Sequence, residues 1–135
     1  ETEIYAAIER VLEHRGLTSR VAYGVEISAP SYAYRFKTAW MNGTRQVMEP
    51  ISFDYLNGTE VVEKANTWSG RLLNLSKGER FQMTGVVAMP SRRDLTPAFE
   101  QAVRILREAP NVRTVIREDD LESFADEIVR DLESH

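Results

Sequence analysis

The chain has 135 residues, a length typical of one domain. Its 42% hydrophobic and 28% charged residues are ordinary for a folded protein and exclude a disordered segment. The absence of cysteine excludes disulfides, thiolate metal sites and cysteine nucleophiles, and neither a signal peptide nor a membrane-length apolar run is visible. We expect one cytoplasmic domain over residues 1–135, and because the chain begins with Glu1 rather than methionine, we expect it to belong to a longer protein.

Charge is distributed unevenly along the chain. The net charge is −4, yet residues 20–93 carry ten Lys and Arg against six Asp and Glu. Residues 94–135 carry eleven acidic residues against five Arg. A basic middle suits a nucleic-acid backbone. Ordinary surface charge is the alternative, since no cluster of Lys and Arg stands out.

The predicted elements begin with a helix near Thr2–His14, where apolar residues recur at helical spacing. Gly16 follows as a residue that can end the helix in the left-handed conformation. A strand is then predicted near Arg20–Ile27, because apolar and other residues alternate there.

The next two strands are predicted to form a hairpin. One runs near Tyr32–Met41 and the other near Thr44–Tyr55, with Asn42 and Gly43 between them. Asn-Gly between alternating strands is the strongest short-range signal for a hairpin turn. Pro50 predicts that the second of these strands has an edge position or a bulge.

Two crossover units follow. A helix is predicted near Thr59–Leu75, and Asn57 with Glu60 has the spacing of a capping box. The strand Arg80–Met89 is apolar on both faces, which is typical of a central strand covered on both sides.

The last three elements are a helix, a strand and a helix. The helix is predicted to begin with Thr96 as N-cap and Pro97 at the first helical position. The strand is Val112–Arg117, and Asp119 is the predicted cap of the final helix.

The predicted fold class is α/β with a mixed sheet, in the order α-β-β-β-α-β-α-β-α. An antiparallel meander of three strands leads into two right-handed crossovers, so strands three, four and five should be parallel. Helices on both faces of the sheet then give three layers.

Glu49 is the first candidate site residue. With a two-residue loop, Glu49 lies opposite Phe36, and paired residues project to the same face. A carboxylate on an apolar face must find a partner or rise in pKa, as many catalytic carboxylates do. Alternatively, a bulge at Pro50 turns Glu49 outward. The other residues predicted on this face are Tyr32, Tyr34, Trp40, Val47, Ile51, Phe53 and Tyr55.

Asp54 and Lys64 are the next candidates. Asp54 ends the third predicted strand, and ligands in α/β sheets usually bind at the carboxyl ends of strands. Together with Glu49, and with Lys64 on the next helix, Asp54 can hold a divalent metal through oxygen ligands. The alternative is that Asp54 is a turn or cap residue.

Four residues are candidates for binding. Arg35 and Lys37 share a predicted strand face with Gln46, where they suit a phosphate or simply form the solvated side of the meander. Trp68 lies on the inward stripe of its helix, with Arg71 three residues on. Core packing is the simpler role for Trp68, while stacking on a nucleic-acid base requires an exposed indole.

Several signals of catalysis are missing. The two histidines, His14 and His135, have no histidine neighbour at ligand spacing, which argues against zinc and against histidine acid–base catalysis. No glycine-rich phosphate loop is present. Residues 118–133 hold eight acidic residues against one arginine, which indicates a solvated helix face or a dock for a basic partner.

The order α-β-β-β-α-β over residues 1–90 resembles the core of the PD-(D/E)XK, or restriction-endonuclease-like, superfamily. That family places an acidic residue on the second core strand and an acid-x-lysine on the third. Here Tyr32–Met41 has no acidic residue, and the triplets that begin at Glu49 and Asp54 lack the lysine, so Lys64 would have to replace it. The resemblance implies a degenerate, catalytically dead member of this superfamily from a bacterial or phage protein.

We therefore expect a non-catalytic binding domain without a cofactor. Its partner would be a missing N-terminal region of the same protein, another protein, a second copy or nucleic acid, and not a membrane. One alternative is a nuclease using Mg²⁺ held by Glu49 and Asp54, with Lys64 near the scissile phosphate. Another is a small-molecule sensor, with a pocket near the carboxyl ends of strands three to five.

Overall fold

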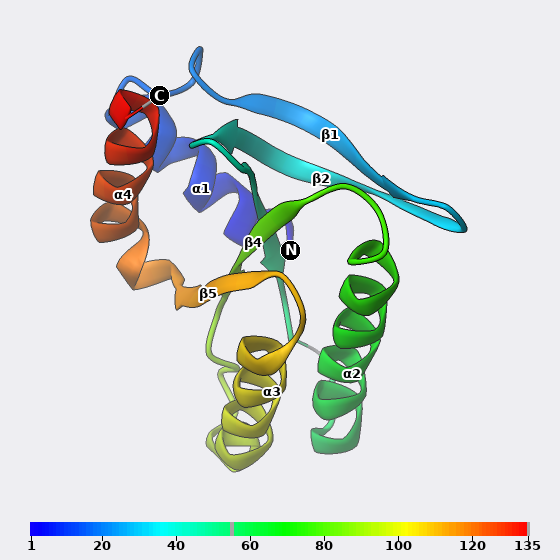
Figure 1. The fold of residues 1–135 in the computed structure, drawn as a ribbon. Coiled ribbons are helices and arrows are strands. Elements are labelled where there is room, and N and C mark those ends of the chain that lie inside the picture. The colour runs from blue at the N-terminus through cyan, green and yellow to red at the C-terminus, as the bar shows by residue number, and fades with distance from the viewer. Residues whose placement is uncertain (55, 135) are drawn as a thin grey trace.

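The computed structural model describes residues 1–54 and 56–134 (Figure 1). Tyr55, predicted on the apolar hairpin face, and His135 lie outside the described residues. The described residues form a five-stranded mixed sheet and four α-helices, which confirms the predicted fold class and element order. The elements are α1 (Thr2–His14), β1 (Ala22–Ala29), β2 (Tyr32–Met41), β3 (Arg45–Ile51), α2 (Gly58–Leu75), β4 (Phe81–Val87), α3 (Thr96–Glu108), β5 (Val112–Arg117) and α4 (Leu121–Ser134), with short 3₁₀ turns at Arg93–Leu95 and Glu118–Asp120.

The strands lie in the order β1-β2-β3-β4-β5. The first three are antiparallel neighbours, whereas β3, β4 and β5 are parallel, as predicted. Both parallel connections move across the sheet in one direction, so right-handed crossovers place α2 and α3 on the same face. The helices α1 and α4 cover the other face, which gives three layers (Figure 1). In the described ranges, no helix combines the length and the apolar character needed to cross a membrane.

Two hydrophobic cores lie on opposite faces of the sheet. The neighbouring residues Val86 and Val87 of β4 are buried in different cores, which confirms that β4 is central and covered on both sides. Full burial of a large apolar side chain contributes about 1.5–3 kcal/mol. The core under α2 and α3 includes Phe36, Val47, Ile51, Leu72, Phe81, Met83 and Phe99. The core under α1 and α4 includes Ile8, Leu12, Trp40, Met48, Phe124 and Ile128.

The register of the β2–β3 hairpin differs by one residue from the prediction. Met41 pairs with Arg45, so the loop spans residues 42–44 instead of two residues. The Asn42 side chain closes this loop by accepting the Thr44 amide at 3.3 Å, and Gly43 takes a positive φ of 93°. Continued along the strands, this register places Lys37 opposite Glu49.

The alternation of side chains along β2 also slips. Phe36 and Ala39 lie in the same core, although side chains on one face of a regular strand are an even number of residues apart. Gly24 on the paired strand β1 adopts a left-handed φ of 59° at this level. Trp40 consequently packs in the opposite core from Phe36, so the prediction that they share a face is wrong.

The capping box at the start of α2 is confirmed, whereas two other predicted caps are wrong. The Asn57 side chain accepts the Glu60 amide at 2.8 Å, and the Glu60 carboxylate accepts the Asn57 amide at 3.0 Å. In contrast, α3 begins at Thr96 itself, and Asp119 lies within a 3₁₀ turn that leads into α4. The physical reason is that a 3₁₀ turn precedes each of these helices, so the chain is already coiled where a cap was expected.

Candidate functional site

Glu49 lies on the face of the sheet under α2, at the point where β2 separates from β3. The last pair between these strands is Thr38 with Met48. Pro50 keeps its register with Val86 of β4, so no bulge turns Glu49 outward. Only 4% of the residue surface of Glu49 is exposed. The prediction that Glu49 faces an apolar core is therefore confirmed, and Pro50 occupies a local edge, beyond the last β2 partner.

The Glu49 carboxylate has two hydrogen-bond donors. The Tyr34 hydroxyl donates at 2.9 Å, and the backbone amide of Lys37 donates at 2.8 Å. Burial raises the pKa of Glu49, although these two hydrogen bonds act in the opposite direction. Both donors belong to the part of β2 that has left β3. Glu49 therefore connects the separated strands, a structural role that needs no ligand.

Trp68 and Arg71 of α2 form a stacked group beside this connection. The Arg71 guanidinium carbon lies 4.4 Å from the ring centre of Trp68 and 4.5 Å from that of Tyr34. Its Nε donates to the Tyr32 hydroxyl at 2.7 Å. Trp68 is only 4% exposed, which confirms its predicted packing in the core. An indole so covered offers no open face to a nucleic-acid base.

Asp54 and Lys64 lie near the carboxyl end of β3. The strand ends at Ile51, earlier than predicted, so Asp54 is exposed in the following turn. The Lys64 ammonium donates to the Glu1 carboxylate at 2.8 Å and to the Ser52 carbonyl. Burial opposes ionisation of Glu1, but the hydrogen bond and charge of Lys64 lower its pKa overall. Lys64 therefore forms an ion pair with Glu1.

Glu49 lies outside the groove that the other two catalytic candidates share. Asp54 and Lys64 line a surface groove of about 440 Å³ near the carboxyl end of β3. The Glu49 carboxylate instead accepts a hydrogen bond from the Tyr34 hydroxyl. Across residues 1–54 and 56–134, no three Asp, Glu or His side chains gather closely enough to hold a metal ion. The other charged residues of this groove are Glu1, Glu3 and Glu118.

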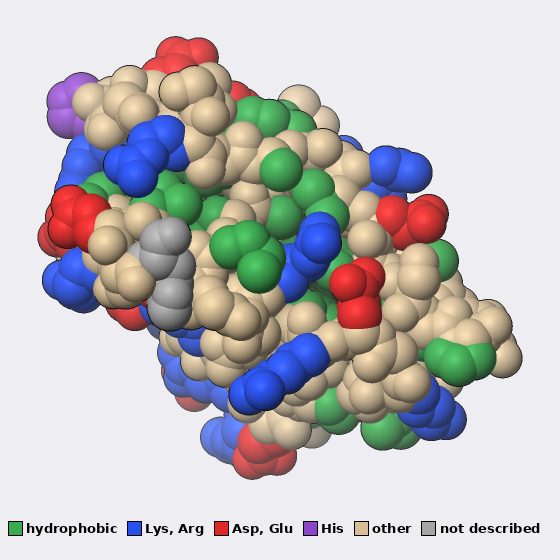
Figure 2. Space-filling model, turned by 45° about the horizontal axis from the view of Figure 1, so that its top comes forward, with side chains coloured by type: hydrophobic (Ala, Val, Ile, Leu, Met, Phe, Trp, Pro, Cys, Tyr) green, Lys and Arg blue, Asp and Glu red, His purple; other side chains and the backbone are tan. Residues whose placement is uncertain are grey.

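Arg35 and Lys37 contact different parts of the chain. The Arg35 guanidinium lies 3.8 Å from the carboxylate of Glu26, its partner on the neighbouring strand β1, and donates to the Gly24 carbonyl. The Lys37 ammonium lies 5.8 Å from the ring centre of Tyr5 on α1. Seen from the side of β1, basic and acidic side chains are interspersed (Figure 2). This distribution fits the solvated side of a meander.

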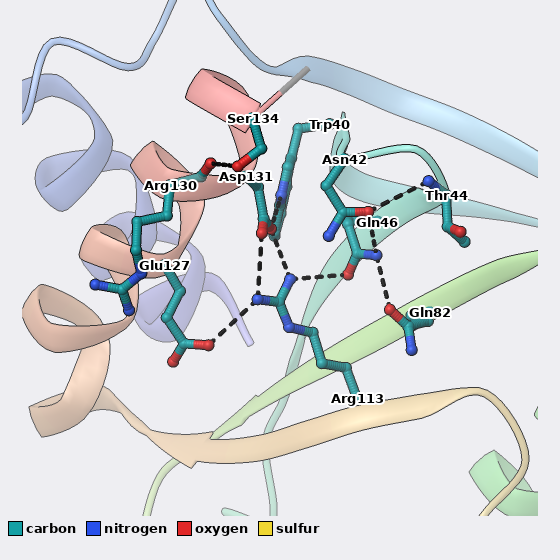
Figure 3. A network of polar contacts seen from close by, with 10 residues as sticks. All are labelled: Trp40, Asn42, Thr44, Gln46, Gln82, Arg113, Glu127, Arg130, Asp131 and Ser134. Atoms are coloured by element: carbon teal, nitrogen blue, oxygen red, sulfur yellow. Dashed lines mark hydrogen bonds and ion pairs between the residues drawn. The ribbon is translucent and has the colours of Figure 1, made fainter.

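A polar network that the sequence reasoning misses joins β5 to α4 (Figure 3). Arg113 donates to Asp131 at 2.6 Å and to Glu127 at 3.2 Å, and the Trp40 indole donates to Asp131 at 2.8 Å. Burial acts against ionisation of Asp131, but the hydrogen bonds from Arg113 and Trp40 outweigh it and lower the pKa of Asp131. The spacing of Glu127 and Asp131, four residues apart on a helix, is the available sequence signal.

Gln46 belongs to this network and is not solvated. It is 1% exposed, its amide nitrogen donates to Gln82 at 2.9 Å and to Asn42 at 3.0 Å, and its oxygen accepts from Arg113 at 3.0 Å. Gln46 does lie on the face of the sheet opposite Phe36 and Val47, as predicted. It is buried there rather than solvated, because α4 and Arg113 cover this part of the face.

The acidic helix α4 binds basic residues of its own chain. Arg15, which follows α1, pairs with Asp126 and lies 3.5 Å from Glu122. Arg113 pairs with Asp131 near the other end of the helix. Much of this acidic face is therefore used to hold α4 against α1 and β5.

A second groove, which we call the α3–β5 groove, has a volume of about 460 Å³. It lies at the carboxyl ends of β4 and β5, where ligands usually bind in sheets with parallel strands. Its apolar floor is formed by Val87, Phe99, Val103 and Val115. Its charged residues are Glu100, Arg104, Arg107, Glu108, Arg117 and Asp120.

Two arginines of this groove lie over its floor. Arg107 donates to the Val115 carbonyl at 3.4 Å, and the Arg117 guanidinium carbon lies 5.5 Å from the Phe99 ring centre. In the described part of the chain, neither of them, nor Arg104, has a carboxylate oxygen within 4.0 Å. The sequence predicts a pocket at this location but does not predict these residues. No protein-family model and no curated protein matches this chain.

Proposed function

We propose that this chain is a non-catalytic binding domain on a restriction-endonuclease-like scaffold, and that its ligand occupies the α3–β5 groove. The scaffold is proposed from the order of the elements. The observation that carries the binding function is the contrast between two sets of charged groups. The Glu49 carboxylate and the Lys64 ammonium are engaged in contacts within their own chain, whereas three arginines with no carboxylate oxygen within 4.0 Å among the described residues line one groove with an apolar floor.

The geometry around Glu49 supports the absence of catalysis. A metal-dependent nuclease needs carboxylate oxygens that converge on an ion, which activates water and neutralises the phosphate. The oxygens of Glu49 accept hydrogen bonds from Tyr34 and from the Lys37 amide. An ion would have to displace both donors, and Asp54 lies in an exposed turn outside this contact.

A cleavage assay tests this part of the proposal. Supercoiled plasmid is incubated with the purified chain and Mg²⁺ or Mn²⁺, and we expect no nicking. Cleavage by the parent that disappears in both Glu49→Gln and Asp54→Asn would establish the nuclease instead. Glu63→Gln, on the exposed side of α2, is the matched control for loss of one carboxylate.

The α3–β5 groove also favours a second function, that of a small-molecule sensor. Its volume of about 460 Å³ lies within the range of small-molecule pockets, roughly 300–1,000 Å³. A ligand that binds the folded state raises the melting temperature.

A gel shift with duplex and single-stranded DNA tests nucleic acid as the partner. Arg107→Glu should weaken binding at the groove, and Arg80→Glu, at the amino end of β4, is the control.

A further inference from the structure

We infer that the α3–β5 groove binds a small, singly charged organic anion, in which one carboxylate or sulfonate is attached to an apolar body. This inference rests on the proposed binding function and names the chemistry of its ligand. It follows from the floor of the groove, from the position of its arginines and from the acidic residues around them.

The floor selects an apolar body. Val103 is partly exposed and offers the open apolar surface of the floor, while Val87 and Phe99 behind it are each 1% exposed, so the hydrophobic core holds the floor in place. An apolar group placed on this floor leaves water without requiring the core to rearrange. An inorganic ion would leave the floor unused, so the ligand should carry an apolar part.

The arginines select a negative charge. Arg107 and Arg117 both lie over the floor, through contacts with Val115 and Phe99. A guanidinium has five N–H donors in a planar fork, and the single long bond of Arg107 leaves most of them available. Such a fork binds a carboxylate with two parallel hydrogen bonds. The two arginines therefore provide the anchor for the charged end of the ligand.

The acidic residues limit the charge of the ligand. Glu100, Glu108 and Asp120 also line the groove. Their charges balance those of Arg104, Arg107 and Arg117, so the lining has no surplus positive charge for a second anionic group on the ligand. Glu100→Gln should accordingly strengthen the binding of a monoanion.

Two fluorescent probes with similar apolar bodies test the inference. Anilinonaphthalene sulfonate carries one negative charge, and phenylnaphthylamine is its neutral counterpart. We expect one equivalent of the sulfonate to bind, with an affinity about tenfold higher than that of the neutral probe. Arg107→Gln and Arg117→Gln should each lower the affinity for the sulfonate by up to about tenfold, while Arg80→Gln leaves this affinity unchanged.

Each result has one interpretation. Equal binding of both probes, no binding of the sulfonate, or the same loss in Arg80→Gln overturns the anion site. Thermal melting of each variant confirms that it is folded, and the glutamine substitutions keep much of the arginine stem packing. The plasmid assay is unaffected by these outcomes. A failed probe titration without cleavage therefore removes only the anion site, whereas cleavage removes the non-catalytic function.

Discussion

Replacement of Glu49 separates a structural role from a chemical one. Glu49→Ala removes the acceptor of both the Tyr34 hydroxyl and the Lys37 amide. An unsatisfied buried donor costs about 1–3 kcal/mol, and because these donors are only partly buried we expect a total loss of about 2–3 kcal/mol. Glu49→Gln can accept from the Lys37 amide and donate to the Tyr34 oxygen, since that hydroxyl rotates. Its stability should stay within about 1 kcal/mol of the parent.

Urea unfolding at neutral pH measures both variants. A loss of about 2–3 kcal/mol corresponds to a midpoint lower by roughly 0.7–3 M, because the urea dependence is about 1–3 kcal/mol/M. The hydrogen bonds of Glu49 stabilise the folded state, whereas we expect its negative charge to destabilise it. Burial raises the pKa of Glu49 above its ordinary 4.5, so the folded state keeps a proton that the unfolded state has lost. Its contribution to stability therefore falls as pH rises from about 4.5 to the folded pKa, and then levels off.

The pair of variants decides between the two roles. The fall in stability with pH should be present in the parent and reduced in Glu49→Gln. If Glu49→Gln loses as much stability as Glu49→Ala, then the negative charge itself is required, and the reasoning from hydrogen bonds is refuted. A parent that gains stability over Glu49→Gln as pH rises through this range would contradict the raised pKa.

Three further predictions concern stability and are measured by thermal or urea unfolding. Gly78→Ala should cost about 3 kcal/mol or more, because its Cβ would lie 2.1 Å from the Ser28 carbonyl oxygen; a loss below about 1 kcal/mol would contradict this close approach. Arg113→Ala should cost about 2–3 kcal/mol, since it leaves the carboxylate of Asp131, whose side chain is 11% exposed, without its cation. A double-mutant cycle with Asp131→Ala should give a coupling of about 1–2 kcal/mol, and zero coupling would exclude the pair as a stabilising contact. Asn57→Ala should cost about 1 kcal/mol through loss of the cap, and an unchanged midpoint would count against it.

The layers and the directions of the strands could be predicted from the sequence, because helices and strands repeat with different periods and connections between parallel strands are right-handed. Side chains of β4 alternate between two buried faces, and this pattern alone indicates a central strand. The hairpin register could not be predicted in the same way. One additional loop residue, Thr44, moves every β3 partner by one position, and the slip in β2 moves Trp40 to the other core.

The site is predictable only where one segment determines it. Glu49 faces the core because residues 47, 49 and 51 alternate normally on β3, but its bond to the Lys37 amide depends on where β2 leaves the sheet. The network of Arg113, Asp131 and Gln46 joins three distant segments, so packing rather than local pattern brings it together. The α3–β5 groove likewise combines side chains of a helix and a strand.

The most direct test of the binding function is an amide chemical-shift titration of the whole chain with anilinonaphthalene sulfonate. We predict that the largest shifts fall on the lining of the α3–β5 groove, at Phe99, Val103, Val115 and Arg117. Shifts that gather instead around Asp54 and Lys64, with the α3–β5 groove unchanged, would contradict it.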